Sequence, residues 1–417
     1  MDPNLFYAQY LGIEVTPVES TGDKLAPKPS SYFALIDYQN NVTPEADISG
    51  YNFHVPYLTV IFQNSLITDF AAEVQLFMEY LFHEEAYLLG STDGRNMISL
   101  KGVAERHNGK TTYSFGFSGA NRFELSGKTL REVEIVKAQF ATDPFKDPRP
   151  EPLPITGRFF LWGRIRFVHH EAFDVLSFGA EPKPADPPKP DYLSMSNLQV
   201  TMSFKLNTVS SEVTEKKFEF KPQQMAFDLN RSGWRKQSLY EKFPLKFKAF
   251  KSVIDDPNAL SSSGYMPVNS PLKTVELDDI WYGIEYDLNL GGAGALAGST
   301  GLVAGILVAW VPEEEGLYLG LKLPGATGGK KEVTIQGLLK IVFKSIRFES
   351  YKDPAPGVPD NTGYLLKLKN ITIKFMVASF PPSGKTEIIL FGDPRPSEEV
   401  PLRKDKLLGW YASYVNK

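Results

Sequence analysis

The sequence contains no cysteine among its 417 residues and only five histidines. Without cysteine, the chain forms no disulfide, builds no thiolate metal site such as a zinc finger, and has no catalytic thiol. The absence fits any cellular compartment, because reducing and oxidising environments both tolerate proteins without thiols. Five histidines leave little material for metal or acid–base sites built on imidazole.

An excess of positive charge and an apolar leader are also missing. The formal net charge is −4 and the isoelectric point is about 5.9. A dedicated nucleic-acid binder needs clustered lysine and arginine to displace phosphate counterions, so we expect no nucleic-acid partner. Residues Met1 to Phe6 lack the basic and apolar regions of a secretory signal. We expect synthesis in the cytoplasm, and export by a non-classical route stays open.

Material for β-strands is abundant. Hydrophobic residues make up 42% of the chain and aromatic residues 13%, in a sequence long enough to fill a sizeable core. Alternation of apolar and polar residues dominates, and aromatic side chains suit cross-strand pairs. The sequence therefore predicts an all-β protein with few short helices.

Two hairpins can be placed directly. Strands on either side of Asn108-Gly109 fall within residues 103–117, and this dipeptide is the preferred filler of a two-residue type I′ turn. A second hairpin joins Ile306 to Trp310 with Leu317 to Leu323 through Pro312 to Gly316. Residues 67–82 fit both a helix and a strand, and periodicity cannot decide between them.

The apolar positions change parity at five places along the alternating segments. A one-residue shift in a regular strand would turn the following apolar side chains to the wrong face. A β-bulge or bend at the dipeptide where parity changes keeps both halves facing one interior, so we expect bulged, amphipathic strands. The dipeptides are Lys101-Gly102, Gly163-Arg164, Ser196-Asn197, Lys344-Ser345 and Lys369-Asn370.

Two of these units end alike. Val175 to Pro182 contains Phe178-Gly179 and then an acidic residue and proline, and Ile389 to Pro394 contains Phe391-Gly392-Asp393-Pro394. We interpret this as a degenerate repeat in extended, curved or rolled antiparallel sheets. The alternative is coincidence, since bulges and Phe-Gly pairs are common in β proteins.

Proline-rich stretches divide the chain at residues 144–154, 182–190 and 354–359. Such runs cannot continue a helix or an inner strand, so they mark linkers or surface loops. We predict a β-rich module at 1–155 and a second at 156–417 with the bent-strand repeats, or else one continuous sheet system.

The candidate metal or acid–base residues lie in two similar segments and are His83, Glu85, His169, His170 and Glu171. Imidazole beside carboxylate suits either chemistry. However, adjacent strand residues point to opposite faces, so His169 and His170 cannot reach one ion without a bend. We therefore favour surface or loop-end histidines, and we predict no metal, no cofactor and no catalytic residue.

Other motifs point only faintly to function. The glycine-rich segments 290–298 and 325–331 fail the dinucleotide and P-loop spacings. Residues 288–312 carry no charge and are long enough to span a bilayer, but their six glycines and polar residues disfavour insertion. Lys246, Lys248 and Lys251 suit the wet face of a strand better than an anionic ligand.

A resemblance rests on residues 288–324, Lys330 to Leu339 and Leu408 to Tyr411, and extends back through Ile67 to Phe70 and Lys137 to Phe140. Together these segments look like a domain of very large, uncharacterised bacterial β-rich proteins. That family has no assigned activity, so the resemblance transfers no site. It implies a bacterial source and a modular parent, of which this chain is a short relative or an excised portion.

Four functions are compatible with these features. The leading hypothesis is a non-enzymatic structural or interaction protein that presents a surface to a protein partner or to copies of itself. The alternatives are a carrier of lipid or another apolar ligand with a β-lined groove, a hydrolase on a β scaffold, and a membrane-active toxin component.

Overall fold

The computed structural model confirms an all-β protein. Of the described residues, 67% lie in strands and 5% in helices, and the sheets are antiparallel. The structure describes residues 6–14, 19–21, 24–26, 31–39, 53–63, 66–90, 96–107, 110–117, 121–142, 150–170, 173–179, 191–207, 213–221, 224–243, 245–252, 264–277, 280–289, 303–323, 331–335, 339–353, 361–375, 377–380, 386–392 and 409–414.

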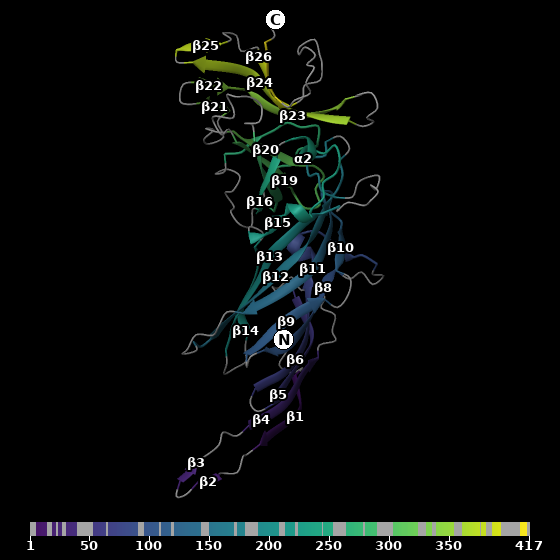
Figure 1. The fold of residues 1–417 in the computed structure, drawn as a ribbon, viewed down its shortest axis with the longest axis vertical. Helices are drawn as coiled ribbons and strands as arrows, with labels where there is room; N and C mark the ends of the chain where they lie inside the picture. The colour runs from purple at the N-terminus through teal and green to yellow at the C-terminus, as the bar shows by residue number, and fades with distance from the viewer. Residues whose placement is uncertain are drawn as a thin grey trace. The chain divides into compact units, whose positions relative to one another are not determined.

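The first large sheet is six-stranded and has the order β1-β4-β5-β6-β8-β9 (Figure 1). A separate two-stranded sheet pairs β2 (Glu19–Thr21) with β3 (Lys24–Ala26). The strands of the large sheet are β1 (Phe6–Glu14), β4 (Ser31–Gln39), β5 (Phe53–Gln63), β6 (Leu66–Phe77), β8 (Met97–His107) and β9 (Lys110–Phe117).

The second large sheet has the order β14-β13-β12-β11-β10-β7, and β15 also pairs with β13. Its longest strand has 15 residues. The strands are β7 (Ala86–Leu88), β10 (Arg122–Leu125), β11 (Leu130–Thr142), β12 (Leu153–Phe167), β13 (Leu193–Leu206), β14 (Val213–Lys221) and β15 (Ala226–Asp228).

Two further sheets contain the remaining strands, in the orders β16-β18-β19-β20-β17 and β21-β22-β24-β26-β27, where β23 and β25 also pair with β24. Their bounds are β16 (Leu245–Ser252), β17 (Met266–Pro267), β18 (Tyr282–Asn289), β19 (Val303–Trp310), β20 (Tyr318–Lys322), β21 (Glu332–Ile335), β22 (Leu339–Val342), β23 (Ser345–Asp353), β24 (Asn361–Phe375), β25 (Ala378–Phe380), β26 (Thr386–Gly392) and β27 (Gly409–Tyr414). The helices are short: α1 (Glu79–Phe82), α2 (Leu239–Lys242) and one 3₁₀ turn (Leu229–Arg231).

Packing divides the chain into two compact units, each discontinuous in sequence. Unit 1 contains residues 1–125, 133–163 and 196–221, and unit 2 contains residues 126–132, 164–195 and 222–417. The division falls inside three strands, β11, β12 and β13. The modules 1–155 and 156–417 stay a prediction, because these units describe packing in the folded chain and not independent folding.

The ambiguous segment 67–82 is strand for most of its length. β6 continues to Phe77, and Ala72, Val74 and Leu76 are buried while the residues between them are partly exposed. The segment therefore follows the alternating pattern and not the helical spacing, because β6 pairs with a strand on each side, β5 and β8. Helix follows only in the four residues of α1.

Both predicted hairpins are present. His107 pairs with Lys110, which leaves Asn108 and Gly109 as the connecting loop outside the described residues. In the second hairpin Ile306 pairs with Leu321 and Val308 with Leu319. Its loop contains Glu313 and Gly316, both with positive φ.

Two predicted parity changes are confirmed at asparagine residues. Asn197 has φ 60° and Asn370 has φ 53°, which is the left-handed conformation that asparagine tolerates better than most residues. On β13, Leu193 and Met195 before the change and Leu198, Val200 and Met202 after it are all buried. The left-handed Asn197 thus stands where the parity of the buried apolar residues changes.

The change at Lys344-Ser345 lies opposite the one at Lys369-Asn370. β22 pairs with residues 372–375 of β24, and β23 pairs with residues 361–369. The strand pairing along β24 is therefore interrupted where β24 changes parity. The backbone N–H of Lys344 donates to the carbonyl of Lys369 at 3.0 Å. Phe343, Ile346 and Phe348 are buried on both sides of the interruption.

The parity changes predicted at Gly163-Arg164 and Lys101-Gly102 are wrong. On β12, Phe159, Leu161, Gly163, Ile165 and Phe167 are buried in unbroken alternation. On β8, Ile98, Leu100 and Gly102 are buried, and Val103 is 46% exposed.

Both errors occur at a buried glycine. Because glycine has no apolar side chain, the position was not counted as part of the buried face, and a change of parity was predicted there. At Gly102 the space is filled by the cross-strand partner Phe115, whose Cε1 lies 2.6 Å from where a Cβ would stand.

The two Phe-Gly segments share a backbone conformation. Gly179 has φ 144° and Gly392 has φ 146°, values that residues with a side chain rarely adopt. A Cβ would stand 2.5 Å from the carbonyl oxygen of Phe167 at the first glycine, and 2.5 Å from that of Tyr364 at the second. This local likeness is a fact of the structure, whereas the repeat as a whole and the rolled character of the sheets stay predictions.

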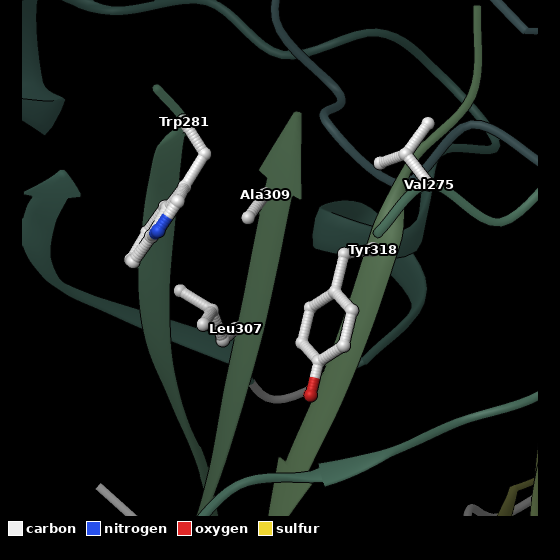
Figure 2. Close-up of a cluster of buried hydrophobic side chains, with 5 residues drawn as sticks. All are labelled: Val275, Trp281, Leu307, Ala309 and Tyr318. Atoms are coloured by element: carbon white, nitrogen blue, oxygen red, sulfur yellow. The ribbon is translucent and has the colours of Figure 1, made fainter. Parts of the chain in front are cut away.

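The core of unit 2 surrounds β18, β19 and β20, which are buried on both faces. Figure 2 shows the cluster on one face, formed by Val275, Trp281, Leu307, Ala309 and Tyr318. On the other face, the Trp310 ring lies 5.6 Å from Phe167 and 6.0 Å from Phe250 in edge contacts. Trp310 is 1% exposed, and the sheet with both faces buried forms the centre of the core of unit 2.

Candidate functional site

The sequence-predicted site residues are divided between the two units. His83, in the left-handed position that ends α1, is exposed, and Glu85 is exposed and accepts a hydrogen bond of 2.7 Å from Tyr87. His169 and His170 are half-buried, belong to the other unit, and follow β12. Glu171 lies outside the described residues. Within the described residues no group of three histidine, aspartate or glutamate side chains is arranged to hold a metal ion.

A buried ion pair, which the sequence did not indicate, lies in unit 2. Arg235 Nη2 donates to Asp174 Oδ1 at 2.6 Å and Arg235 Nε donates to Asp174 Oδ2 at 2.8 Å. The two side chains are 1% and 7% exposed. Arg235 Nη1 also donates to the carbonyl of Phe167 at 3.3 Å, so it binds the end of β12 as well.

Polar residues around this pair connect three parts of unit 2. The Tyr364 hydroxyl of β24 donates to the Gln237 carbonyl at 2.8 Å, and the Gln237 side chain accepts from the Thr362 N–H at 3.2 Å. Ser177 Oγ accepts from the N–H of Tyr240 at 3.1 Å. Burial raises the pKa of Tyr364, which stays protonated as a donor.

This network is built to hold the fold and not to react. Asp174 and Arg235 bind each other in the bidentate geometry that carboxylate and guanidinium prefer, so both oxygens of the carboxylate are occupied. The pair joins the segment after β12 to the segment before α2. We therefore assign it a structural role.

A second charged cluster surrounds Glu285 on β18. Its Oε1 accepts from the Tyr265 hydroxyl at 2.6 Å and from Lys248 Nζ at 3.1 Å, and Lys251 Nζ lies 3.7 Å from Oε2. Lys248 also lies 3.6 Å from Asp287. The lysines of β16, whose side chains are about half exposed, thus serve as partners of a buried carboxylate.

The Glu285 cluster predicts an acid-sensitive contribution to stability. Burial alone would raise the pKa of Glu285, but the hydrogen bonds from Tyr265 and Lys248 outweigh burial, and the pKa is lowered. The contribution is therefore present above the ordinary glutamate pKa near 4.5 and is lost as the pH falls through the lower folded-state pKa. Thermal midpoints of the wild type should fall through this acidic range more steeply than those of Glu285→Gln, and parallel curves would contradict the assignment.

The strongest candidate for an interaction surface is the end of β24. Before the bend its inward residues are buried: Tyr364 at 2%, Leu366 at 1% and Leu368 at 2%. Ile371, directly after the bend, is 0% exposed. Exposure then rises along the same face, through half-buried Ile373 to Phe375 at 50%. The core-facing side of β24 therefore continues past the core that covers it.

The hairpin that follows is apolar where hairpins are usually polar. Phe375 pairs with Ala378 of β25, so the loop consists of Met376, which lies outside the described residues, and Val377. Two-residue loops favour asparagine and glycine, as at Asn108-Gly109. Val377 is fully exposed, at 102%. We call Ile373, Lys374, Phe375, Val377 and Ala378 the β24 tip (Figure 1).

This end of the sheet is rich in lysine. Lys374 pairs in register with Lys340 of β22, although like charges directly opposite each other are unfavourable. Lys340 is neutralised by Glu332 at 2.6 Å, and Lys374 has no ion-pair partner among the residues that the structure describes. Five lysines and two glutamates are found in this end of the sheet: Lys331, Lys340, Lys344, Lys369, Lys374, Glu332 and Glu387.

Comparison of the chain with protein-family models, with curated proteins and with solved structures finds no match. Within the described part of the chain, no helix has the length and apolar character needed to cross a membrane. The glycine-rich segments 290–298 and 325–330 lie outside the described residues.

Proposed function

We propose that this chain is a non-enzymatic structural or interaction protein, a β scaffold whose binding surface is the β24 tip. The observation that carries the proposal is the rise in exposure along one face of β24, from 0% at Ile371 to 50% at Phe375, followed by a fully exposed Val377 in the adjoining loop. Large apolar side chains gathered at the surface mark binding sites, because water contact is unfavourable for them.

The buried charges support a non-enzymatic role. Asp174 is bound by Arg235, and Glu285 by Tyr265 and two lysines, so both carboxylates are held by residues of this chain. A catalytic acid or base instead needs access to its substrate. These pairs weigh against the hydrolase alternative.

The other two alternatives have less support than the binding scaffold. A carrier needs space between its apolar faces, but in unit 1 the rings of Phe115, Phe140 and Phe159 contact one another with centroids 4.8–5.7 Å apart. A toxin segment at 288–312 would have to leave its sheet, since Asn289 pairs with Val303 and β19 is paired on both sides.

Panning a random peptide library against the immobilised protein tests the proposal without a known partner. Peptides gather on surfaces suited to binding, and we expect the enriched peptides to lose at least tenfold in affinity for Val377→Asp, because a charge would replace the exposed apolar anchor. The control is Val103→Asp, the same change at a valine 46% exposed on β8 of unit 1. Enriched peptides that bind all three proteins equally would refute a peptide-binding role for the β24 tip.

A further inference from the structure

We propose that the β24 tip binds the surface of an anionic lipid membrane, with Phe375 and Val377 entering the headgroup region and the neighbouring lysines contacting lipid phosphates and carboxylates. This inference rests on the proposed function, because it names the partner of the same surface. It requires an apolar anchor, positive charge beside the anchor, and an apolar surface that is large enough for a bilayer but too small for a stable protein interface.

The apolar anchor is small and stands at a turn. Phe375 is 50% exposed and Val377 102% exposed, and they are separated by one residue at the loop of a hairpin. Together they offer on the order of 250 Å² of apolar surface. A stable protein–protein interface buries about 800 Å² on each partner, so the β24 tip by itself is too small to hold two copies of the chain together.

A bilayer places no such demand on area. An apolar side chain gains free energy on entering the interface region regardless of the shape of its neighbours, so a few residues suffice when charge assists them. Membrane contact would also explain why an apolar residue, Val377, stands in a hairpin loop. Val377 contributes nothing to packing, since it is fully exposed, and its apolar character is useful only against another apolar phase.

The charge around the anchor has the sign that an anionic surface attracts. The described residues of this end of the sheet include five lysines and two glutamates, a difference of three positive charges, on a chain with net charge −4. Register places Lys331, Lys344 and Lys369 near the bend, and Lys374 and Lys340 beside the anchor. Lys374 is next to Phe375 and Lys340 is its cross-strand neighbour. Lysines close to a membrane surface strengthen binding to anionic lipid additively and in a salt-dependent manner.

The lysines also disfavour self-association through this surface. Lys374 and Lys340 flank the anchor, and a two-fold contact between copies would bring two such sets together. Repulsion of like charges adds to the small apolar area as an argument against a second copy. Charge complementarity instead favours acidic lipid headgroups.

Co-sedimentation of the full chain with lipid vesicles tests the inference. We expect binding to phosphatidylcholine vesicles containing about 30% phosphatidylserine, little binding to pure phosphatidylcholine, and release when salt rises from about 0.1 M to about 0.5 M. Val377→Asp should weaken the binding at least tenfold, and Lys374→Gln about fivefold. Val103→Asp should bind as the wild type does, and circular dichroism should show that all variants are folded.

Three results would overturn the inference. They are no binding of the wild type to anionic vesicles, binding that Val377→Asp leaves intact, or equal losses in Val377→Asp and Val103→Asp. If library peptides depend on Val377 but vesicles do not bind, the β24 tip is a binding surface for protein and the lipid assignment alone fails. If neither peptides nor vesicles depend on Val377, the proposed function fails as well.

Discussion

Replacing Arg235 with methionine is expected to lower the free energy of unfolding by about 3–5 kcal/mol, because the substitution leaves the Asp174 carboxylate buried without its partner. The two side chains share hydrogen bonds of 2.6 and 2.8 Å and are almost completely buried. The substitution also removes the hydrogen bond from Arg235 Nη1 to the Phe167 carbonyl oxygen. Urea unfolding followed by tryptophan fluorescence measures the loss.

The control for this prediction removes both charges. Asp174→Leu combined with Arg235→Met leaves no unpaired ion, so it should cost less than Arg235→Met alone. A loss below about 0.5 kcal/mol for the single variant, which is ordinary for surface changes, would show that the pair does not hold unit 2 together.

Gly179→Ala is expected to cost about 2–5 kcal/mol. The glycine has φ 144°, where a side chain adds backbone strain of about 1–3 kcal/mol. The new Cβ would also meet Arg235 Nη1 and the Phe167 carbonyl oxygen, and such overpacking costs a further 1–3 kcal/mol or so. Gly392→Ala should show a similar loss, because its φ is 146° and the Tyr364 carbonyl oxygen lies equally close.

Gly116→Ala supplies the matched control for the glycine variants. It lies on β9, where an added Cβ would meet no heavy atom within 4 Å. Its free energy of unfolding should change by less than about 1 kcal/mol. Equal effects at Gly116 and Gly179 in urea titrations would mean that the Phe-Gly conformation carries no special constraint.

The strand content was predictable because it depends on local alternation. The bends at Asn197 and Asn370 were predictable for a related reason: a left-handed residue reverses parity, and asparagine is tolerated there. The pattern failed at Gly102 and Gly163 because each glycine occupies a buried position without an apolar side chain, and at Gly102 the ring of Phe115 fills the space. A sequence pattern does not show which side chain of a neighbouring strand fills the space beside a glycine.

The candidate site was much less predictable than the fold. Asp174 and Arg235 are 61 residues apart and neither stands in a motif, so only the folded chain reveals the pair. Ile371, Ile373 and Phe375 look alike in sequence, as three apolar residues on one strand face. Periodicity indicates which face they share, but it does not indicate where the covering core ends. An apolar residue in a two-residue hairpin loop was the one local sign available.

The two histidine segments look alike in sequence but have different structural settings. His83 ends the helix α1 in unit 1, whereas His169 follows the strand β12 in unit 2. His83 is exposed, and His169 and His170 are half-buried. The expectation of surface or loop-end histidines stays a prediction.

A fluorophore attached at position 377 tests the central claim most directly, and the absence of cysteine makes it feasible, since Val377→Cys would supply the single thiol for labelling. An environment-sensitive dye there should shift its emission to the blue and brighten when phosphatidylserine-containing vesicles are added. The same dye on Val103→Cys should not respond. Unchanged emission at position 377, or equal changes at both positions, would contradict the account.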